Sequence, residues 1–249
     1  TLSCDWDNRD IVPCIIITKS VPNTSQISSK GVKRYIISAK TIRESGALDI
    51  ADAIEMVPGI NLTQSGPMGQ QTSVFTRGTG SNHTLVLLNG IPINDQSTTQ
   101  GLHDFGVDFI QSIQQIEVYT GSNGVHFGPN AIGGAINFVT SGDFANAISV
   151  SGFNNKNKIV NTNYSFITGN GWNLNFKGAL INSATDSAIQ GGSEKDGVKN
   201  FNGNLNAEKW INDNVKFRAT VFSRQTTSEY DSSSTVEKEY TGNNLMYAT

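Results

Sequence analysis

The sequence predicts an α+β domain followed by a series of antiparallel β-strands, and three observations lead to this expectation. Charged residues make up only 16% of the 249 positions and there are 25 glycines, a composition that suits strands and turns better than long surface helices. In the first part of the chain, short helical patterns alternate with short apolar runs. In the second part, apolar and polar residues alternate with a period of two.

A change in asparagine content marks the expected boundary between these parts. Residues 1–142 contain nine asparagines, whereas the shorter stretch 143–249 contains eighteen. The turn-forming trio Ser141-Gly142-Asp143 lies at this change. We therefore expect three segments: an N-terminal leader at 1–31, an α+β domain at 32–141 and a β-rich region at 142–249.

Two short helices are expected in the α+β domain. One follows the candidate cap Ser38 and ends at Gly46, and the other follows Asp49 and ends at Pro58-Gly59. The second has apolar residues at the spacing of one helical face, namely Ile50, Ala53, Ile54 and Val57. Strand-like runs surround the helices at 35–37, 60–63, 73–76, 84–88, 91–93, 116–119 and 135–139. Asn89-Gly90 predicts a two-residue hairpin turn between two of them, since both central residues of that turn need a positive φ.

The second part reads as strands with one apolar and one polar face. In residues 172–181, apolar side chains at Trp172, Leu174, Phe176 and Leu180 alternate with Asn173, Asn175 and Lys177. Residues 160–166, 201–207 and 215–224 alternate in the same way. The pattern fits a membrane barrel with lipid outside and equally a soluble antiparallel sheet with one wet face. About five such strands are visible, fewer than the smallest membrane barrels contain, so the sequence predicts an incomplete barrel.

Several function classes find no support in the sequence. The net charge of −3 gives no global basic field for nucleic acid, and no apolar run is long enough for a membrane-spanning helix. No nucleophile elbow, phosphate-binding loop or Cys/His metal spacing is present, so we do not expect an enzyme. Cys4 and Cys14 either form a disulfide in an oxidising compartment or are unpaired thiols in a tail. The chain begins at Thr1, after removal of a signal peptide or as a fragment of a longer gene product.

A set of motifs between residues 32 and 140 carries a family resemblance. In order along the chain they are Asp52-Ala53-Ile54, Val57-Pro58-Gly59-Ile60, Gln70, Phe75-Thr76-Arg77-Gly78, Leu85-Val86-Leu87-Leu88-Asn89-Gly90, Ile116-Glu117-Val118 and the run from Gly128 to Asn137. Together they resemble the plug of TonB-dependent outer-membrane receptors, in particular those that transport cobalamin. The resemblance implies an α+β plug domain followed by antiparallel strands of a truncated transmembrane β-barrel.

The resemblance also implies residues that hold the plug in the barrel. Arg77 and Glu117 are charges in apolar strand contexts, and in the family the corresponding residues lie at the plug–barrel interface. Gly133 and Gly134 would let the backbone approach the barrel wall closely. The family usually has Arg-Gly-Pro where this chain has Thr120-Gly121-Ser122, so the expected basic cluster is weakened and the anchoring should differ in detail.

The leader contains the β-prone run Ile15-Ile16-Ile17-Thr18. Such a run can add a strand to the sheet of a partner. In the resembled family this position holds the TonB box, to which the energy-coupling protein TonB binds from the inner membrane. The alternative is an ordinary edge strand of the plug.

The expected substrate side consists of neutral polar loops at 64–71, 79–83 and 94–103. Their candidate ligand-binding side chains are Gln64, Ser65, Gln70, Asn82, Asn94, Gln96 and Gln100. Neutral hydrogen-bonding groups favour a large neutral ligand such as a corrinoid over an acidic siderophore. The alternative is that these are simply polar surface loops.

Side chains with oxygen atoms near the expected strand ends are candidate calcium ligands, because Ca²⁺ prefers oxygen donors. They are the carboxylates of Asp186, Glu194, Asp196 and Asp231 and the hydroxyl of Tyr230. The cobalamin-transporting receptors order substrate loops with calcium in this region, and the resemblance therefore implies a possible Ca²⁺ site but no required cofactor. The alternative is that the charges keep the loop tips soluble.

These expectations combine into one principal hypothesis and two alternatives. The principal hypothesis is TonB-dependent uptake of a corrinoid across the bacterial outer membrane, with lipid around the barrel and the plug facing the periplasm. The first alternative is a ferric-siderophore receptor of the same class. The second is a surface receptor or adhesin that uses a plug-like domain without transporting anything.

Overall fold

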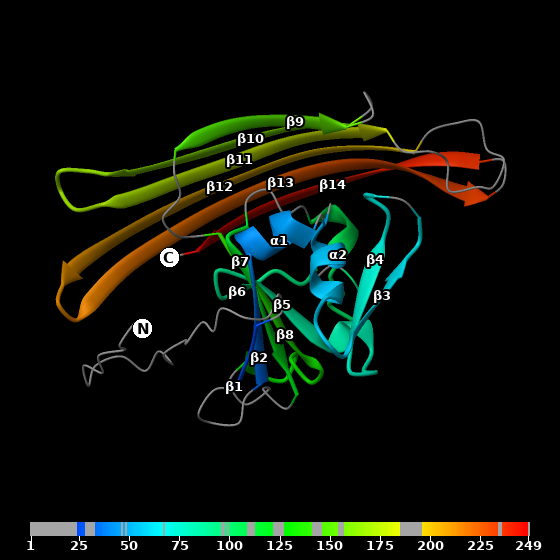
Figure 1. Ribbon diagram of the computed structural model, residues 1–249, viewed down its shortest axis with the longest axis horizontal. Coiled ribbons are helices and arrows are strands. Elements are labelled where there is room, and N and C mark those ends of the chain that lie inside the picture. The colour runs from blue at the N-terminus through cyan, green and yellow to red at the C-terminus, as the bar shows by residue number, and fades with distance from the viewer. Residues whose placement is uncertain are drawn as a thin grey trace.

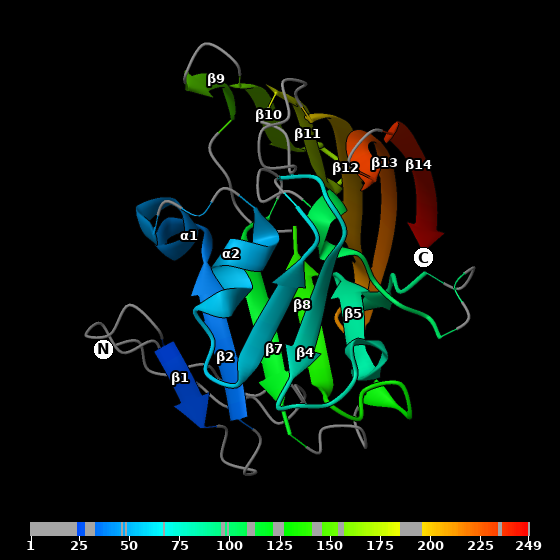
Figure 2. The same cartoon turned by 90° about the vertical axis from the view of Figure 1, so that its right-hand side faces the viewer.

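The fold is taken from a computed structural model of the chain. It describes residues 24–27, 33–45, 47, 49–66, 68–95, 98, 100–108, 113–121, 127–140, 146–153, 157–184, 196–233 and 236–248. Two bodies of structure are present, a mixed α+β domain and a long curved sheet that lies along one side of it (Figures 1 and 2).

A six-stranded mixed sheet forms the centre of the first domain. Its order is β1 (Thr24–Ile27), β2 (Lys33–Ser38), β7 (Gln115–Thr120), β8 (Gly134–Val139), β5 (Thr84–Leu88) and β6 (Ile91–Pro92). Strands β5 and β8 pair in parallel, and the other neighbours pair antiparallel. The sequence-based expectation missed β1, because its run Thr-Ser-Gln-Ile has no apolar alternation.

The two expected helices are present and begin at the expected caps. Helix α1 (Ala39–Ser45) follows Ser38, whose Oγ accepts a hydrogen bond from the amide of Thr41 at 3.1 Å. Helix α2 (Ile50–Glu55) follows Asp49, whose carboxylate accepts from the amide of Asp52 at 2.8 Å. These caps satisfy amides that would otherwise lack a partner in the first helical turn. Within the described ranges, no helix is long and apolar enough to cross a membrane.

The main core of this domain lies between the sheet and a layer made of both helices and a hairpin. The hairpin joins β3 (Ile60–Gln64) to β4 (Thr72–Thr76), and Figure 2 shows α2 and β4 in front of β7 and β8. Ile54, Val74, Ile116 and Val118 meet there with essentially no exposed surface. Burying such side chains is the dominant stabilising contribution to a domain of this size.

The turn predicted at Asn89-Gly90 is confirmed. It connects β5 to β6, and the two residues have φ angles of 51° and 86°. Two short 3-10 helices complete the domain, η1 (Ser81–His83) and η2 (Phe105–Val107). The second is anchored by Asp104, whose Oδ1 accepts from the amides of Gly106 and Thr72, each at 2.9 Å.

The second body is an antiparallel sheet in which each strand pairs with the next in the chain. Its strands are β9 (Ala147–Phe153), β10 (Asn157–Ile167), β11 (Asn173–Ala184), β12 (Gly197–Asn212), β13 (Val215–Ser233) and β14 (Val236–Ala248). Figure 1 shows these strands as a curved wall beside the first domain. We call this sheet the barrel sheet. We call the first domain the plug and its six-stranded sheet the plug sheet, after the family that the sequence resembles.

The predicted alternation along the strands is confirmed, and it separates two chemically different faces. On β11, Phe176 and Leu180 are 46% and 54% exposed, whereas Asn175 and Lys177, on either side of Phe176, are 3% and 2% exposed. The polar face is buried because the first domain lies against it. This inner face of β12 carries asparagines at every second position, namely Asn200, Asn202, Asn204 and Asn206.

Candidate functional site: the interface between the plug and the barrel sheet

An ion pair joins the first domain to the barrel sheet. Asp108 follows directly after η2 and lies against Arg224 of β13, and both side chains are at least nine-tenths buried. The other carboxylate oxygen of Asp108 contacts Nε2 of His103 at 2.5 Å. Burial alone would raise the pKa of Asp108, but the charges of His103 and Arg224 outweigh burial and lower it. Asp108 is therefore a carboxylate that connects a cation of the barrel sheet to the domain core.

A second group of contacts forms where the plug sheet ends. The amide nitrogen of the Asn89 side chain donates to Thr140 Oγ1 at 2.8 Å and to Asn206 Oδ1 at 3.3 Å. The backbone amide of Thr140 donates back to Asn89 Oδ1 at 2.9 Å. Lys177 of β11 donates to the carbonyl oxygen of Thr140. Asn89 thus has a second role besides the hairpin turn, because its side chain binds both Thr140, the residue that follows β8, and the inner face of the barrel sheet.

The loop between β3 and β4 makes the third contact. Ser228 of β13 donates to the carbonyl of Gly69 at 2.8 Å, and the Gln70 side chain donates to the carbonyl of Glu229. A Cβ on Gly69 would lie 2.7 Å from Val198, and Gly69 has a φ of 90°. Only glycine combines this conformation with this approach.

Glycine 106 holds the same loop against η2. A Cβ at this position would lie 1.8 Å from the carbonyl oxygen of Gln70. Close backbone contact therefore links η2, which precedes Asp108, to the loop that contacts β12 and β13. The close contact between Gly106 and Gln70 therefore connects the two segments that bind the barrel sheet, one through Gly69 and the other through Asp108.

The interface is largely polar, apart from Phe222 of β13, which packs against the plug core, and Met68 of the plug, which packs against Ile159, Ile181 and Val198. The side-chain oxygens of Asn161, Asn175 and Asn202 and the side-chain nitrogen of Asn204 are buried and have no hydrogen-bond partner among the residues that the structure describes. A cavity of about 20 Å³ lies between the two bodies, lined in part by Asp108, Asn202 and Arg224. An interface of this kind exchanges hydrogen bonds with water at small net cost, unlike an apolar core.

The four residues expected at the plug–barrel interface make their described contacts inside the plug. Glu117 pairs with Arg34 of β2. In the β2–β7 pairing Glu117 lies opposite Ile36, and Arg34 is two residues from Ile36 on the same face of the sheet, so the two side chains meet diagonally. Arg77 is an exposed turn residue with a φ of 52° whose guanidinium lies beside Gly121.

The close approaches of Gly133 and Gly134 are likewise internal to the plug. A Cβ on Gly133 would lie 2.3 Å from Thr79 Oγ1, and one on Gly134 would lie 2.3 Å from the carbonyl oxygen of Tyr119. These glycines therefore let loop and sheet pack closely within one domain. A role for Arg77, Glu117, Gly133 and Gly134 at the barrel wall stays a prediction.

Glu117 is also the centre of a polar network on the plug sheet. It accepts hydrogen bonds from the side chains of Gln115, Tyr119 and Asn137 at 2.7, 2.9 and 3.0 Å. Burial of Tyr119, together with the charge of Glu117, raises the pKa of the tyrosine. Asn137 belongs to the Gly128–Asn137 signature, so one function of that motif is to complete this network.

The expected substrate-loop residues have different surroundings. Gln64, Ser65 and Gln100 are exposed, and Asn82 is half-buried in η1. Gln70 is buried by its contact with β13.

Asn94 is committed to the backbone. Its Oδ1 accepts from the amide of Val86 at 2.7 Å, and its Nδ2 donates to the carbonyls of Thr84 and Gly101 at 3.1 and 2.9 Å. It therefore holds the 94–102 loop to β5. Gln96 lies outside the described residues, and ligand binding by the set stays a prediction.

Most of the predicted calcium ligands and the predicted TonB box lie outside the described residues. Ile15, Ile16, Ile17, Thr18, Asp186 and Glu194 belong to this group, as do the side chains of Tyr230 and Asp231. Asp196, which precedes β12, is described and is only 2% exposed. Among described residues no group of three acidic, histidine or cysteine side chains could hold a metal ion. The calcium site stays a prediction.

The residues that do join the two bodies were missed as a set. Arg224 is one of the polar residues in the alternating run 215–224, and a cation on a covered face needs a buried partner. That requirement was a usable signal for a partner on the plug. Nothing local identifies Asp108 as that partner, because it is 116 positions away in the sequence.

Comparison with known proteins agrees with this architecture. The family model described as the TonB-dependent Receptor Plug Domain matches residues 26–135. The vitamin B12 transporter BtuB of Vibrio vulnificus is 37% identical over 106 residues, which are 43% of this chain and 17% of that protein. The match thus spans about a sixth of the relative's length.

Solved structures extend the likeness to the barrel sheet. The siderophore receptor PirA from Acinetobacter baumannii has a TM-score of 0.57 at 21% identity, over 84% of this chain and 32% of PirA. The ferric yersiniabactin uptake receptor FyuA from Yersinia pestis has a TM-score of 0.58 at 19% identity, over 80% of this chain and 32% of FyuA. At these identities the likeness concerns the fold. The relatives are transporters and receptors, which supports the expectation that the chain is not an enzyme. Residues 26–135 therefore match the plug domain of TonB-dependent receptors, and the plug and the barrel sheet together share the fold of these solved receptors.

Proposed function

We propose that this chain is the plug and part of the wall of a receptor that transports a corrinoid across the bacterial outer membrane. The observation that carries the proposal is the seating of the plug on the asparagine-rich inner face of β12. Contacts with the β12 asparagines are hydrogen bonds, as between Asn206 and Asn89, which water can replace when the plug moves. A passage for a polar nutrient can open along this asparagine row, beside the two apolar contacts made by Phe222 and Met68.

Outer-membrane localisation is supported by the opposite face of the barrel sheet. Tyr164, Phe176, Leu205 and Val221 are each more than 40% exposed there. They form one apolar row across β10 to β13, since each is paired with the next in register. A row of this kind is expected to face lipid.

We assign the direction of insertion from the longest connection. Residues 168–172 and 213–214 connect strands at one end of the sheet. Residues 154–156, 185–196 and 234–235 connect them at the other end, and 185–196 is the longest of the five. Barrels of this type have short periplasmic turns and longer extracellular loops. The 185–196 end is therefore extracellular in our proposal, and the loop at 65–71 faces toward that end because Gly69 contacts Ser228.

Energy input is assigned to TonB. The plug domain is that of a TonB-dependent receptor, and Ile15-Ile16-Ile17-Thr18 precedes it at the position where a partner strand could pair. TonB would bind this run and pull on the plug from the periplasm. The polar interface described above is the surface across which that pull would act.

The choice of a corrinoid rests on two lines of support. The relative with 37% identity over the plug is named a vitamin B12 transporter. The exposed loop residues Gln64, Ser65 and Gln100 are uncharged hydrogen-bonding groups, which suit a large neutral ligand better than an acidic ferric chelate.

Binding to the full-length receptor tests the substrate. We expect cyanocobalamin to bind and to compete with uptake of radiolabelled cobalamin into cells. Tight binding of a ferric catecholate or hydroxamate without corrinoid binding would reassign the receptor to siderophore uptake. Cell attachment without uptake of either compound would instead support a non-transporting surface receptor.

A further inference from the structure

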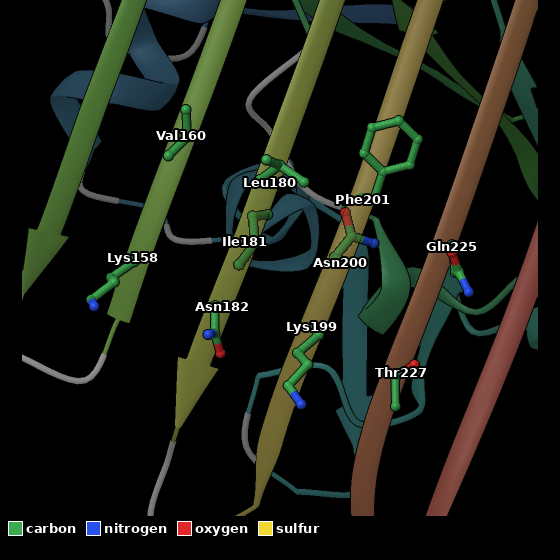
Figure 3. A pocket seen from close by; sticks show the side chains of 10 residues that line it. All are labelled: Lys158, Val160, Leu180, Ile181, Asn182, Lys199, Asn200, Phe201, Gln225 and Thr227. Carbon is green, nitrogen blue, oxygen red and sulfur yellow. The ribbon is translucent and has the colours of Figure 1, made fainter.

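A shallow groove of about 350 Å³ lies on the outward face of the barrel sheet, away from the plug. Figure 3 shows it across strands β10 to β13, where eight of its ten lining side chains form two parallel rows and Ile181 and Asn200 lie between them. One row contains Val160, Leu180, Phe201 and Gln225, and the other contains Lys158, Asn182, Lys199 and Thr227. The plug function does not use this groove.

The strand register fixes the chemistry of the two rows. Val160 pairs with Leu180 and Leu180 with Phe201, so three apolar side chains lie side by side. One step toward the 185–196 end, Lys158 pairs with Asn182 and Asn182 with Lys199. The groove is therefore apolar along one edge and basic and amide-bearing along the other.

The two lysines are available to a ligand. Both are exposed, and neither forms an ion pair with any described residue. They are two strands apart, which places their backbones about 10 Å from one another. Long, flexible side chains at that spacing can converge on one anionic group between them, with Asn182 below it as a hydrogen-bond donor.

The position of the basic row along the strands indicates what kind of molecule supplies that anion. Lys158 and Lys199 follow the last apolar row of the outward face, where the hydrocarbon region of a bilayer would end. Lysines at this depth keep their charge in the headgroup layer while their stems lie on apolar surface. An occupant must therefore present acyl chains to Val160, Leu180 and Phe201 and an anion to the lysines.

We propose that this groove binds an anionic, phosphate-bearing lipid of the outer leaflet. The phosphate lies between Lys158 and Lys199, and an acyl chain lies over Leu180 and Phe201. The site rests on the proposed function, because it requires the outward face to meet a membrane. Its effect is to hold one lipid at the extracellular rim of β10 to β12, beside the strands that end at residues 184 and 197.

Native mass spectrometry of the full-length receptor tests the site. The receptor is released from micelles that contain equal amounts of phosphatidylglycerol and phosphatidylcholine, and the retained lipid is counted. We expect preferential retention of phosphatidylglycerol. Each of Lys158→Ala and Lys199→Ala should reduce the preference about fivefold and the double variant about 30-fold. High salt should weaken the preference in the wild type.

Two control variants make the result specific. Lys209→Ala removes an outward lysine near the opposite end of β12, where its Nζ lies 5.6 Å from the Trp172 ring centroid. Lys40→Ala removes an exposed plug lysine that pairs with Glu44. Both should leave the phosphatidylglycerol preference unchanged, and Lys158→Arg/Lys199→Arg should preserve it. Loss of preference in Lys209→Ala equal to that in the double variant would overturn a local site.

The remaining outcomes separate this site from the proposed transport function. If the wild-type receptor enters bilayers and binds cyanocobalamin but retains both lipids equally, the lipid site is wrong and the transport function stands. Displacement of the lipid by inorganic phosphate alone would show that no acyl chain is recognised and would also overturn the proposal. Failure of the receptor to enter bilayers would count against both the lipid site and the transport function. Bilayer insertion is measured separately from lipid preference.

Discussion

Asp108 of the plug and Arg224 of β13 form a buried ion pair that joins two parts of the chain 116 positions apart. His103 contacts the same carboxylate from within the plug. Removing Arg224 takes away the barrel-sheet partner of the Asp108 carboxylate, which stays buried beside His103. Such a change is more costly than the loss of an exposed pair.

The first prediction concerns this pair. Arg224→Ala should destabilise the seating of the plug by about 3–5 kcal/mol, measured as the denaturant concentration at which limited proteolysis releases the plug from the folded barrel. Arg218→Ala is the matched control, because Arg218 is on the same strand and pairs with Glu208 while half exposed. Its effect should stay below about 1 kcal/mol. Equal effects of both variants would contradict the assignment of Arg224 as the principal connection.

The second prediction concerns pH. The folded-state pKa of Asp108 is lower than its ordinary value of 3.8. The carboxylate therefore contributes stability that is fully present above that ordinary value and is lost as pH falls through the lower, folded-state pKa. The seating free energy of the wild type, relative to that of Asp108→Asn, should be constant from neutral pH to about pH 5 and should shrink below pH 4.

Two other carboxyl groups of the plug titrate in the same pH range, and their pKa values are shifted in the opposite direction from that of Asp108. Burial, partly offset by hydrogen bonds from backbone amides, raises the pKa of both Asp49 and Asp104. These groups destabilise the ionised plug and become neutral as pH falls. The comparison with Asp108→Asn removes the contribution of Asp49, whereas Asp104 keeps its burial in the variant but loses the repulsion from Asp108 that helps to raise its pKa. A difference that grows below pH 4 would show that the sign for Asp108 is wrong.

The third prediction tests the close approach at Gly106. In Gly106→Ala the new methyl group would overlap the carbonyl oxygen of Gln70. We expect a loss of about 1–3 kcal/mol or more in plug stability, together with weaker binding of the 65–71 loop to β13, measured by hydrogen exchange at Gln70. Gly169→Ala is the control, since a Cβ there meets nothing within 4 Å. It should change neither quantity.

The fourth prediction separates the two roles of Asn89. Asn89→Gly keeps the positive φ but removes the hydrogen bonds to Thr140 and Asn206, and it should cost about 1–3 kcal/mol. Asn89→Ala removes the same bonds and adds about 1–2 kcal/mol of left-handed strain. The order wild type, glycine variant, alanine variant should appear in thermal unfolding. Equal stability of the two variants would show that the backbone conformation at position 89 is not constrained.

The fifth prediction concerns energy coupling. Ile16→Pro removes an amide donor from the Ile15–Thr18 run and should prevent it from pairing with a partner strand. Cobalamin uptake by cells should fall to background, whereas binding of cobalamin to the purified receptor should be unchanged. Ile16→Val retains strand propensity and should retain uptake. Normal uptake by the proline variant would remove the basis for assigning a TonB box here.

Local chemistry accounts for what the sequence predicted correctly. Ser38 and Asp49 mark helix starts because only a short polar side chain can accept from amides three residues onward. Asn89-Gly90 marks a turn because both residues tolerate a positive φ. The faces of β11 and β12 follow from a period of two, which needs no knowledge of what lies beyond the sheet.

Long-range partners account for what the sequence did not predict. Glu117 had been expected at the barrel wall, but in the described contacts it pairs with Arg34, a neighbour only after β2 and β7 align. Strand β1 has no apolar pattern and is held by its pairing with β2. Asp108 becomes a partner of Arg224 only when plug and barrel sheet are both in place. None of these relationships leaves a mark within a short window of sequence.

The parallel pairing of β5 with β8 has a consequence for the order in which the molecule can form. It aligns Thr84 with Gly134, and the β2–β7 pairing aligns Lys33 with Thr120. These contacts close long loops, and the plug sheet cannot assemble until the chain has been made through Val139. Each hairpin of the barrel sheet, in contrast, closes between consecutive strands as soon as both exist. The plug is thus the slow-forming part. Strand β5 can pair with β6 through the local hairpin, but its other edge stays unpaired, and available to chaperones, until the Gly128–Asn137 segment arrives.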